Sequence, residues 1–84
     1  MNSKRVFRTE SIDLAAFLTT AGHLPKIIRN PSGNRAVFVF VETPELRSDV
    51  LDYERGATLP GKRLLNVRSW LFREASRVCR EVTQ

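Results

Sequence analysis

The sequence predicts one α+β domain, with a three-stranded antiparallel sheet and three helices in the order β-α-β-β-α-α. Three observations support this. Residues 35–42 read RAVFVFVE and form the most apolar strand of the chain, while residues 62–82 place apolar side chains at helical spacing. Ser11 and Thr43 are helix-start signals, and they predict two further helices in front of the long C-terminal one. With 84 residues the chain has room for a single domain.

The N-terminal part is expected to contain a strand and a buried helix. After a loose end at residues 1–4, residues 5–9 read RVFRT and alternate as a strand does. Ser11 is a suitable N-cap for a helix at 12–21, because its hydroxyl can accept a hydrogen bond from the first turn. That helix is apolar nearly all round, which predicts burial. Gly22 is placed to end it in the left-handed conformation.

The middle of the chain predicts a hairpin. Residues 23–29 read HLPKIIR, and Pro25 favours an edge strand because it has no amide to donate. The turn NPSGN at 30–34 leads into the strand at 35–42, whose other edge is expected to carry the first strand. Because that central strand is apolar on both sides, either helices on both faces or a second copy of the chain should cover it.

Two helices are expected to complete the domain. Thr43 as N-cap and Pro44 at the first helical position begin a helix over 45–55 that Gly56 ends. Its inward residues are expected to be Leu46, Val50, Leu51 and Tyr53. The long C-terminal helix at 62–82 has a broad apolar side and a basic side. The apolar side consists of Leu64, Leu65, Val67, Leu71, Phe72, Ala75, Val78, Cys79 and Val82.

The charge is positive and uneven. The net charge is +5 and the pI is near 10.4, which favours contact with nucleic acid or with an acidic protein surface. Six basic and two acidic side chains at 62–82 give that segment +4, whereas two basic and four acidic ones at 44–55 give −2. Eleven of the fourteen cations are arginines, which suit phosphate contact; a GC-rich genome would produce the same bias.

Several classes of protein are disfavoured. Cys79 is the only cysteine, so an internal disulfide is impossible, and with the lone His23 it makes no metal site. No apolar run reaches the length of a membrane helix and no signal peptide is visible, so we expect a soluble, cytoplasmic protein. No catalytic motif completes a site around His23 or Ser11. We therefore expect no enzymatic activity, no cofactor and no small-molecule substrate.

The first half of the chain carries four short fold motifs, which are Phe-x-Thr at 7–9, Ala-Ala-Phe-Leu at 15–18, Gly22 and Phe-x-Phe at 38–40. Together they resemble an uncharacterised family of short bacterial, archaeal and phage proteins. Where the family carries an aspartate, this chain has Ser11, which is another N-capping residue. The resemblance extends loosely over residues 6–82. The resemblance implies the fold and a phage or mobile-element setting, but it indicates no binding or catalytic function.

The candidate functional residues lie mainly on the basic side of the last helix. Arginines supply phosphate contacts and an exposed tryptophan supplies a stacking surface, so this side predicts binding of DNA or RNA. The candidates on the helix are Lys62, Arg63, Trp70, Arg73, Arg77 and Arg80, with Lys4, Arg5 and Arg8 from the N-terminal segment helping. A solvated helix face, with Trp70 packed against the fold, would explain the same pattern.

A second hypothesis gives Trp70 the role of a protein anchor, since tryptophan and arginine are enriched at interface hot spots. The chain would then be an interaction module that forms a homo-oligomer or docks on an acidic partner. Arg68 lies at the centre of the apolar side of the same helix. It is expected to reach solvent or to pair with Asp49 or Asp52, because a buried charge needs a partner.

Overall fold

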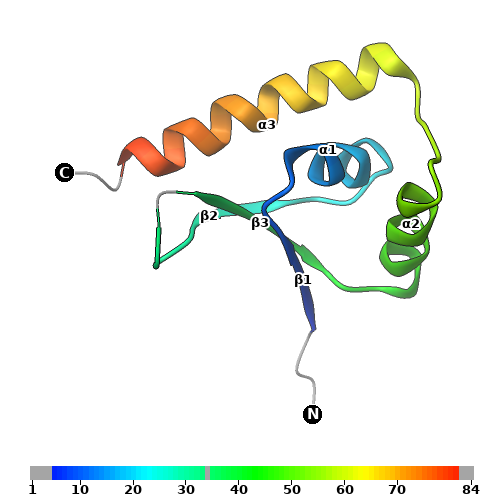
Figure 1. Cartoon of the computed structure of the whole chain (residues 1–84), viewed down its shortest axis with the longest axis horizontal. Helices are drawn as coiled ribbons and strands as arrows, with labels where there is room; N and C mark the ends of the chain where they lie inside the picture. The colour runs from blue at the N-terminus through cyan, green and yellow to red at the C-terminus, as the bar shows by residue number, and fades with distance from the viewer. Residues whose placement is uncertain (1–4, 34, 82–84) are drawn as a thin grey trace.

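Six elements follow one another in the predicted order, which confirms the α+β fold class (Figure 1). They are β1 (Val6–Thr9), α1 (Ile12–Thr20), β2 (Lys26–Arg29), β3 (Ala36–Val41), α2 (Pro44–Glu54) and α3 (Gly61–Glu81). The computed structural model describes residues 5–33 and 35–81. The expected loose end at 1–4, the candidate Lys4 and the last predicted helical residue Val82 lie outside the described residues.

The helix ends follow the predicted capping chemistry. The amide of Leu14 donates to the Ser11 hydroxyl at 3.1 Å, and the amide of Leu46 donates to the Thr43 hydroxyl at 3.0 Å. Each cap satisfies an amide that has no partner inside its helix. Gly22 follows α1 with φ of 112°, in the left-handed region that glycine adopts at little cost. These local signals fix where α1 and α2 begin and where α1 ends.

The sheet has the strand order β1-β3-β2, with both pairs antiparallel. β3 is therefore central and β2 is an edge strand, as predicted. β2 is shorter than the expected 23–29, and its first residue is Lys26. The amide of His23 instead donates to the carbonyl of Leu18 at 3.0 Å, so His23 belongs to the C-terminal turn of α1. Pro25 then offers no amide for a ladder.

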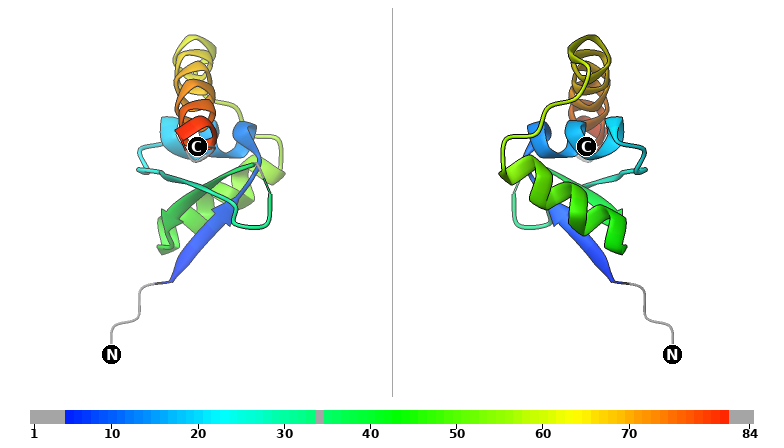
Figure 2. Two further views of the ribbon diagram at one scale, coloured as in Figure 1. Left: turned by 90° about the vertical axis from the view of Figure 1, so that its left-hand side faces the viewer. Right: turned by 90° about the vertical axis from the view of Figure 1, so that its right-hand side faces the viewer.

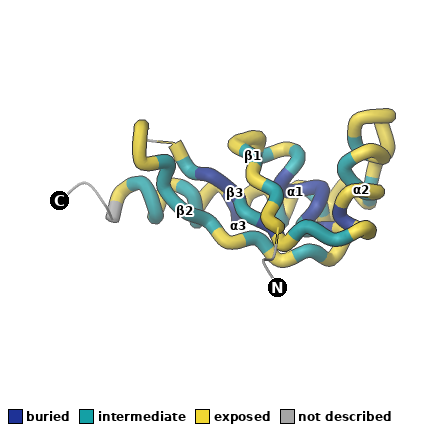
Figure 3. Tube along the Cα trace, turned by 90° about the horizontal axis from the view of Figure 1, so that it is seen from below, coloured by how far each residue is buried: buried dark blue, intermediate teal, exposed yellow. Residues whose placement is uncertain are grey.

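Only one face of the sheet is covered by helices. Phe38 and Phe40 point to that face and are 2% and 1% exposed. There they join Ala15, Ala16, Phe17 and Leu18 of α1, Leu46 of α2 and Leu71 of α3 in the core. α1 packs against α3, and α3 also contacts β2 and β3. Seen from below, the strands lie in front of α3, and no described helix covers them (Figure 3). The alternative with helices on both faces is therefore wrong for the described chain.

α2 packs beside α1 at one end of the molecule (Figure 1). Leu46 is fully buried there, and the ring of Tyr53 lies 5.3 Å from that of Phe17, centroid to centroid. The prediction that Leu51 points inward is wrong, because this side chain is 51% exposed. It lines an open hollow together with Phe7 of β1 and Val50 of α2. None of the helices in the described part of the chain combines the length and the apolar character that a membrane span requires.

Candidate nucleic-acid interface

α3 is anchored by one narrow apolar strip. Leu71 is fully buried, and Leu64, Val67, Ala75 and Val78 are half-buried on the same side of the helix. Their spacing of three and four residues places them in one row. In Figure 1, α3 runs along the top of the molecule, beginning above the connection from α2, passing over α1 and ending above β2. The helix is thus held along its length by one side only.

The strip is narrower than the sequence predicts. Leu65 and Phe72 were expected on the core side, but they are 64% and 59% exposed. α1 is only nine residues long and the sheet has three strands, so these elements cover less of α3 than its apolar side offers. Leu65 and Phe72 are left on a flank of the helix. Three large apolar side chains of α3, counting Trp70 at 41%, are therefore exposed.

The basic side of α3 faces outward, as predicted. Its members share exposure to solvent and helical spacing, and they are Lys62, Arg63, Asn66, Trp70, Arg73, Arg77 and Arg80. We call these seven residues the basic face. Arg63, Trp70 and Arg77 are spaced by seven residues, which keeps them on one line along the helix. Viewed end on, α3 forms the top edge of a molecule whose extents are 40 × 39 × 17 Å (Figure 2).

The field of the basic face is partly reduced by an ion pair within α3. Arg77 Nη2 donates to Glu74 Oε1 at 2.6 Å, one turn away. In total, α3 carries six basic and two acidic residues, which gives the helix a net charge of +4. Such a concentration of like charge on a 21-residue helix attracts polyanions. The exposed Arg63 and Arg73 are the members placed best for phosphate contact, on either side of Trp70.

Arg68 pairs with an acid, but with one the sequence did not indicate. Arg68 Nε donates to Asp13 Oδ1 in the first turn of α1 at 2.6 Å. The predicted partners Asp49 and Asp52 are thus wrong, and Asp49 instead lies 2.7 Å from His23 Nε2. Sequence spacing could not identify this partner because the crossing of α1 and α3 decides it. The pair neutralises Arg68, so the charge available to a ligand is on the basic face.

The two N-terminal candidates lie away from α3. Phe7 pairs in register with Phe40 of the covered face, so the neighbouring Arg8 points to the opposite face of the sheet. Arg5 precedes β1, whose first residues lie at the end of the molecule farthest from α3 in Figures 1 and 2. A ligand lying along the basic face therefore does not contact Arg5 and Arg8. The structure brings together the six candidates of α3 and separates these two.

Some polar residues near the cations were not singled out as candidates from sequence. Ser69 and Ser76 are exposed on α3, between the basic face and the flank of Leu65 and Phe72. A helical projection of the same sequence would have found them. Lys26 was also overlooked, and no local signal marks it. It shares a row with Arg8 on the open face of the sheet, and only the strand register reveals that.

Comparison with known proteins assigns the chain to a family but does not indicate a function. No curated protein and no solved structure matches the chain. One family model, a domain of unknown function (DUF5659), matches residues 4–60. This match spans β1 to α2 and ends just before α3, so the basic face lies outside it. Because more than half of the chain is matched, the protein belongs to the DUF5659 family, and the predicted resemblance to an uncharacterised family is confirmed.

Proposed function

We propose that this protein is a non-enzymatic accessory factor that binds nucleic acid through the basic face of α3. The observation that carries the proposal is the gathering of five cations and an exposed Trp70 on a side of α3 that the fold leaves uncovered. Cations on such a surface bind phosphates and release counterions, which provides affinity without base recognition. Trp70 adds a ring on which an unpaired base can stack.

The dimensions of α3 suit this role. Its 21 residues span about 30 Å, which corresponds to roughly nine nucleotides of a strand that rises 3.4 Å per step. The basic face extends over most of that length, from Lys62 to Arg80. A run of phosphates can therefore meet successive cations along one edge of the molecule. Binding through such a surface is expected to depend strongly on salt concentration.

The test is a binding titration with labelled single-stranded and duplex DNA and RNA of about 20 nucleotides, longer than the stretch α3 can span. Arg63→Glu/Arg73→Glu removes two cations of the basic face. Arg47→Glu/Arg55→Glu is the matched control, because it makes the same change in charge on α2 and at its C-cap. We expect the first variant to lose affinity and to lower the salt slope by about two, because each phosphate contact contributes nearly one.

Two results would contradict the proposal. If both variants lose affinity equally, net charge alone drives the binding and α3 is not the site. If the folded wild type binds none of the four probes at low salt, the basic face is a solvated surface. Circular dichroism of each variant shows whether a loss of binding reflects a loss of helix.

A protein-docking function is the second candidate, and the exposed Leu65, Trp70 and Phe72 favour it. Large apolar side chains on one helix are typical of a surface that meets another protein, including a second copy of the chain. Sedimentation analysis of the wild type and of Trp70→Ala tests self-association. Trp70 lies on a different side of α3 from Leu65 and Phe72, so docking through Trp70 would resist salt and would be lost with Trp70→Ala. Phosphate binding, by contrast, would weaken steeply as salt is added.

A further inference from the structure

The face of the sheet opposite α1 and α3 carries an apolar surface that no described helix covers. β3 places Val37, Val39 and Val41 on it, and the register adds Val6 from β1 and Ile28 from β2. Val6 is 40% exposed and Val41 is 55% exposed, whereas Val37 is only 9% exposed, so the open part of this surface lies toward Val41 and Val6. We call these five residues the valine face. An antiparallel sheet normally presents polar side chains on a face that stays in water, so this composition points to a partner.

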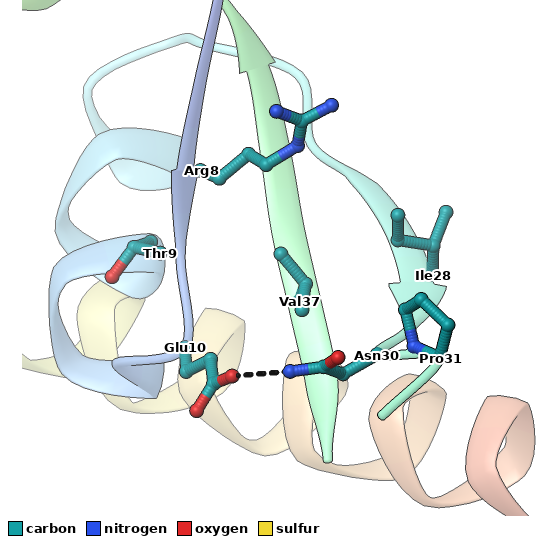
Figure 4. A pocket seen from close by; sticks show the side chains of 7 residues that line it. All are labelled: Arg8, Thr9, Glu10, Ile28, Asn30, Pro31 and Val37. Carbon is teal, nitrogen blue, oxygen red and sulfur yellow. Dashed lines mark hydrogen bonds between the residues drawn. The ribbon is translucent and has the colours of Figure 1, made fainter. Parts of the chain in front are cut away.

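Two cations flank the middle of the valine face. Arg8 and Lys26 both pair in register with Val39, so the three residues form one row across the sheet. Adjacent strands lie about 4.8 Å apart, which places the two cations on outer strands about 10 Å from each other. Both are exposed. The backbone positions of the two cations thus lie on either side of β3, while the long Arg8 side chain extends across that strand (Figure 4).

A hollow of about 370 Å³ lies at one end of this surface (Figure 4). Val37 and Ile28 contribute its apolar wall, and the side chain of Arg8 reaches across β3 beside it. Asn30 Nδ2 donates to Glu10 Oε2 at 2.9 Å and closes the end of the hollow. Glu10 also lies 3.7 Å from Arg35 Nη1. The carboxylate at this rim is therefore already paired, which leaves the field of the row positive.

We propose that the valine face docks an amphipathic helix of a protein partner, with carboxylates on both flanks of the helix's apolar side. A helix with its side chains is about 10 to 12 Å wide, close to the spacing of the backbone positions of Arg8 and Lys26, and both side chains are long enough to reach a carboxylate on its flank. Laid along β3, such a helix buries its apolar side on Val39 and Val41 and brings its carboxylates to the two cations. It completes the second helical layer that a strand apolar on both faces requires.

Charge disfavours a second copy as the occupant. A two-fold pairing of two sheets centred on Val39 stacks the row of Arg8 and Lys26 on its own image, which gathers four cations. Nucleic acid is disfavoured as well, since valines offer no ring for base stacking. The proposal uses none of the residues of α3. It therefore stands or falls independently of nucleic-acid binding by the basic face.

The test uses two designed peptides of about 18 residues, a length sufficient for five helical turns. Both carry a leucine stripe; one has glutamates on the two flanks and its twin has lysines there. Binding to the full chain is measured by fluorescence anisotropy, and the contact surface is mapped from amide chemical shifts. We expect the glutamate peptide to bind at least about tenfold more tightly, with shifts at Val39, Val41 and Ile28.

Matched variants locate the contact. Arg8→Glu/Lys26→Glu should reverse the preference, so that the lysine peptide becomes the tighter ligand. Val41→Ser should weaken both peptides; the side chain is already more than half exposed, so the fold should tolerate the change. Arg63→Glu/Arg73→Glu is the control for the other basic surface, and it should leave the affinity for the glutamate peptide unchanged.

Three outcomes would overturn the proposal. No binding of the glutamate peptide shows that the surface does not accept an acidic helix. Binding that is lost with Arg63→Glu/Arg73→Glu places the peptide on α3. Sedimentation of the wild type as a dimer that Val41→Ser dissociates makes a second copy the occupant. Each outcome is read only for variants whose chemical-shift dispersion matches that of the wild type.

Discussion

The two faces of the sheet differ strongly in burial, although β3 presents apolar side chains to both of them. Phe38 and Phe40 alternate along the strand with Val39 and Val41, and all four are apolar. Yet Phe40 is 1% exposed whereas Val41 is 55% exposed, because α1 and α3 lie together on the phenylalanine face. Burial in this fold therefore depends on how many elements are available to cover a surface. An apolar residue without a cover marks a place where a partner is expected.

The largest expected contrast is between Phe40→Ala and Val41→Ala. Phe40→Ala removes a fully buried ring and should lower the unfolding free energy by about 3 to 5 kcal/mol. Val41→Ala should change it by no more than about 0.5 kcal/mol, as an exposed substitution does. Urea denaturation of both variants measures the difference. Equal losses would mean that the valine face is covered within the monomer.

A similar contrast is expected on α3, between Leu71→Ala and Phe72→Ala. Leu71 is fully buried, so its truncation should cost about 2 to 5 kcal/mol of unfolding free energy. Phe72 is 59% exposed, and its truncation should cost less than about 1 kcal/mol. Thermal unfolding gives both values. A larger loss for Phe72 would show that the helix is rotated relative to this structure.

A smaller effect is expected at the glycine that ends α1, one of the covering elements. At Gly22 the φ of 112° disfavours any other residue, so Gly22→Ala should cost about 1 to 2 kcal/mol. Gly61 begins α3 without positive φ, and an added Cβ meets no atom within 4 Å at either position. Gly61→Ala should therefore be neutral or stabilising. Equal effects, measured by urea denaturation, would contradict the left-handed end of α1.

The smallest effect is expected for the Asp13–Arg68 ion pair between α1 and α3. Both side chains are exposed, at 61% and 45%, so water screens their attraction. A double-mutant cycle with alanine should give a coupling of about 0.2 to 1 kcal/mol that falls as salt is added. A coupling well above this, unaffected by salt, would mean that the pair is the main link between the two helices.

The parts of the fold that local chemistry decides were predicted correctly from the sequence. Ser11 and Thr43 cap the helices they were expected to cap, and β3 is the central strand. The predictions that failed depend on how elements cover one another. Leu51 and Leu65 were expected inside because they are apolar and helically spaced, but the helices have more apolar surface than the small fold can bury.

The candidate site divides in the same way. Residues such as Arg63 and Arg73 share one helix, so their spacing alone places them on one face. Arg8 could not be assigned from spacing, because a strand sends successive side chains to opposite faces and the pairing register decides which. The partner of Arg68 likewise depends on the crossing of α1 and α3. Residue types could be read from the sequence, but the positions of distant segments relative to one another could not.

If α3 binds nucleic acid while the valine face stays available to a protein, a titration with nucleic acid should perturb the two surfaces differently. Amide chemical shifts of the labelled protein are followed as a short DNA duplex is added at low salt. We predict shifts along the basic face, including Asn66, Trp70 and Arg73, and no change in the row of Arg8, Val39 and Lys26. Shifts confined to that row, with α3 unaffected, would mean that nucleic acid binds the valine face and not the basic face.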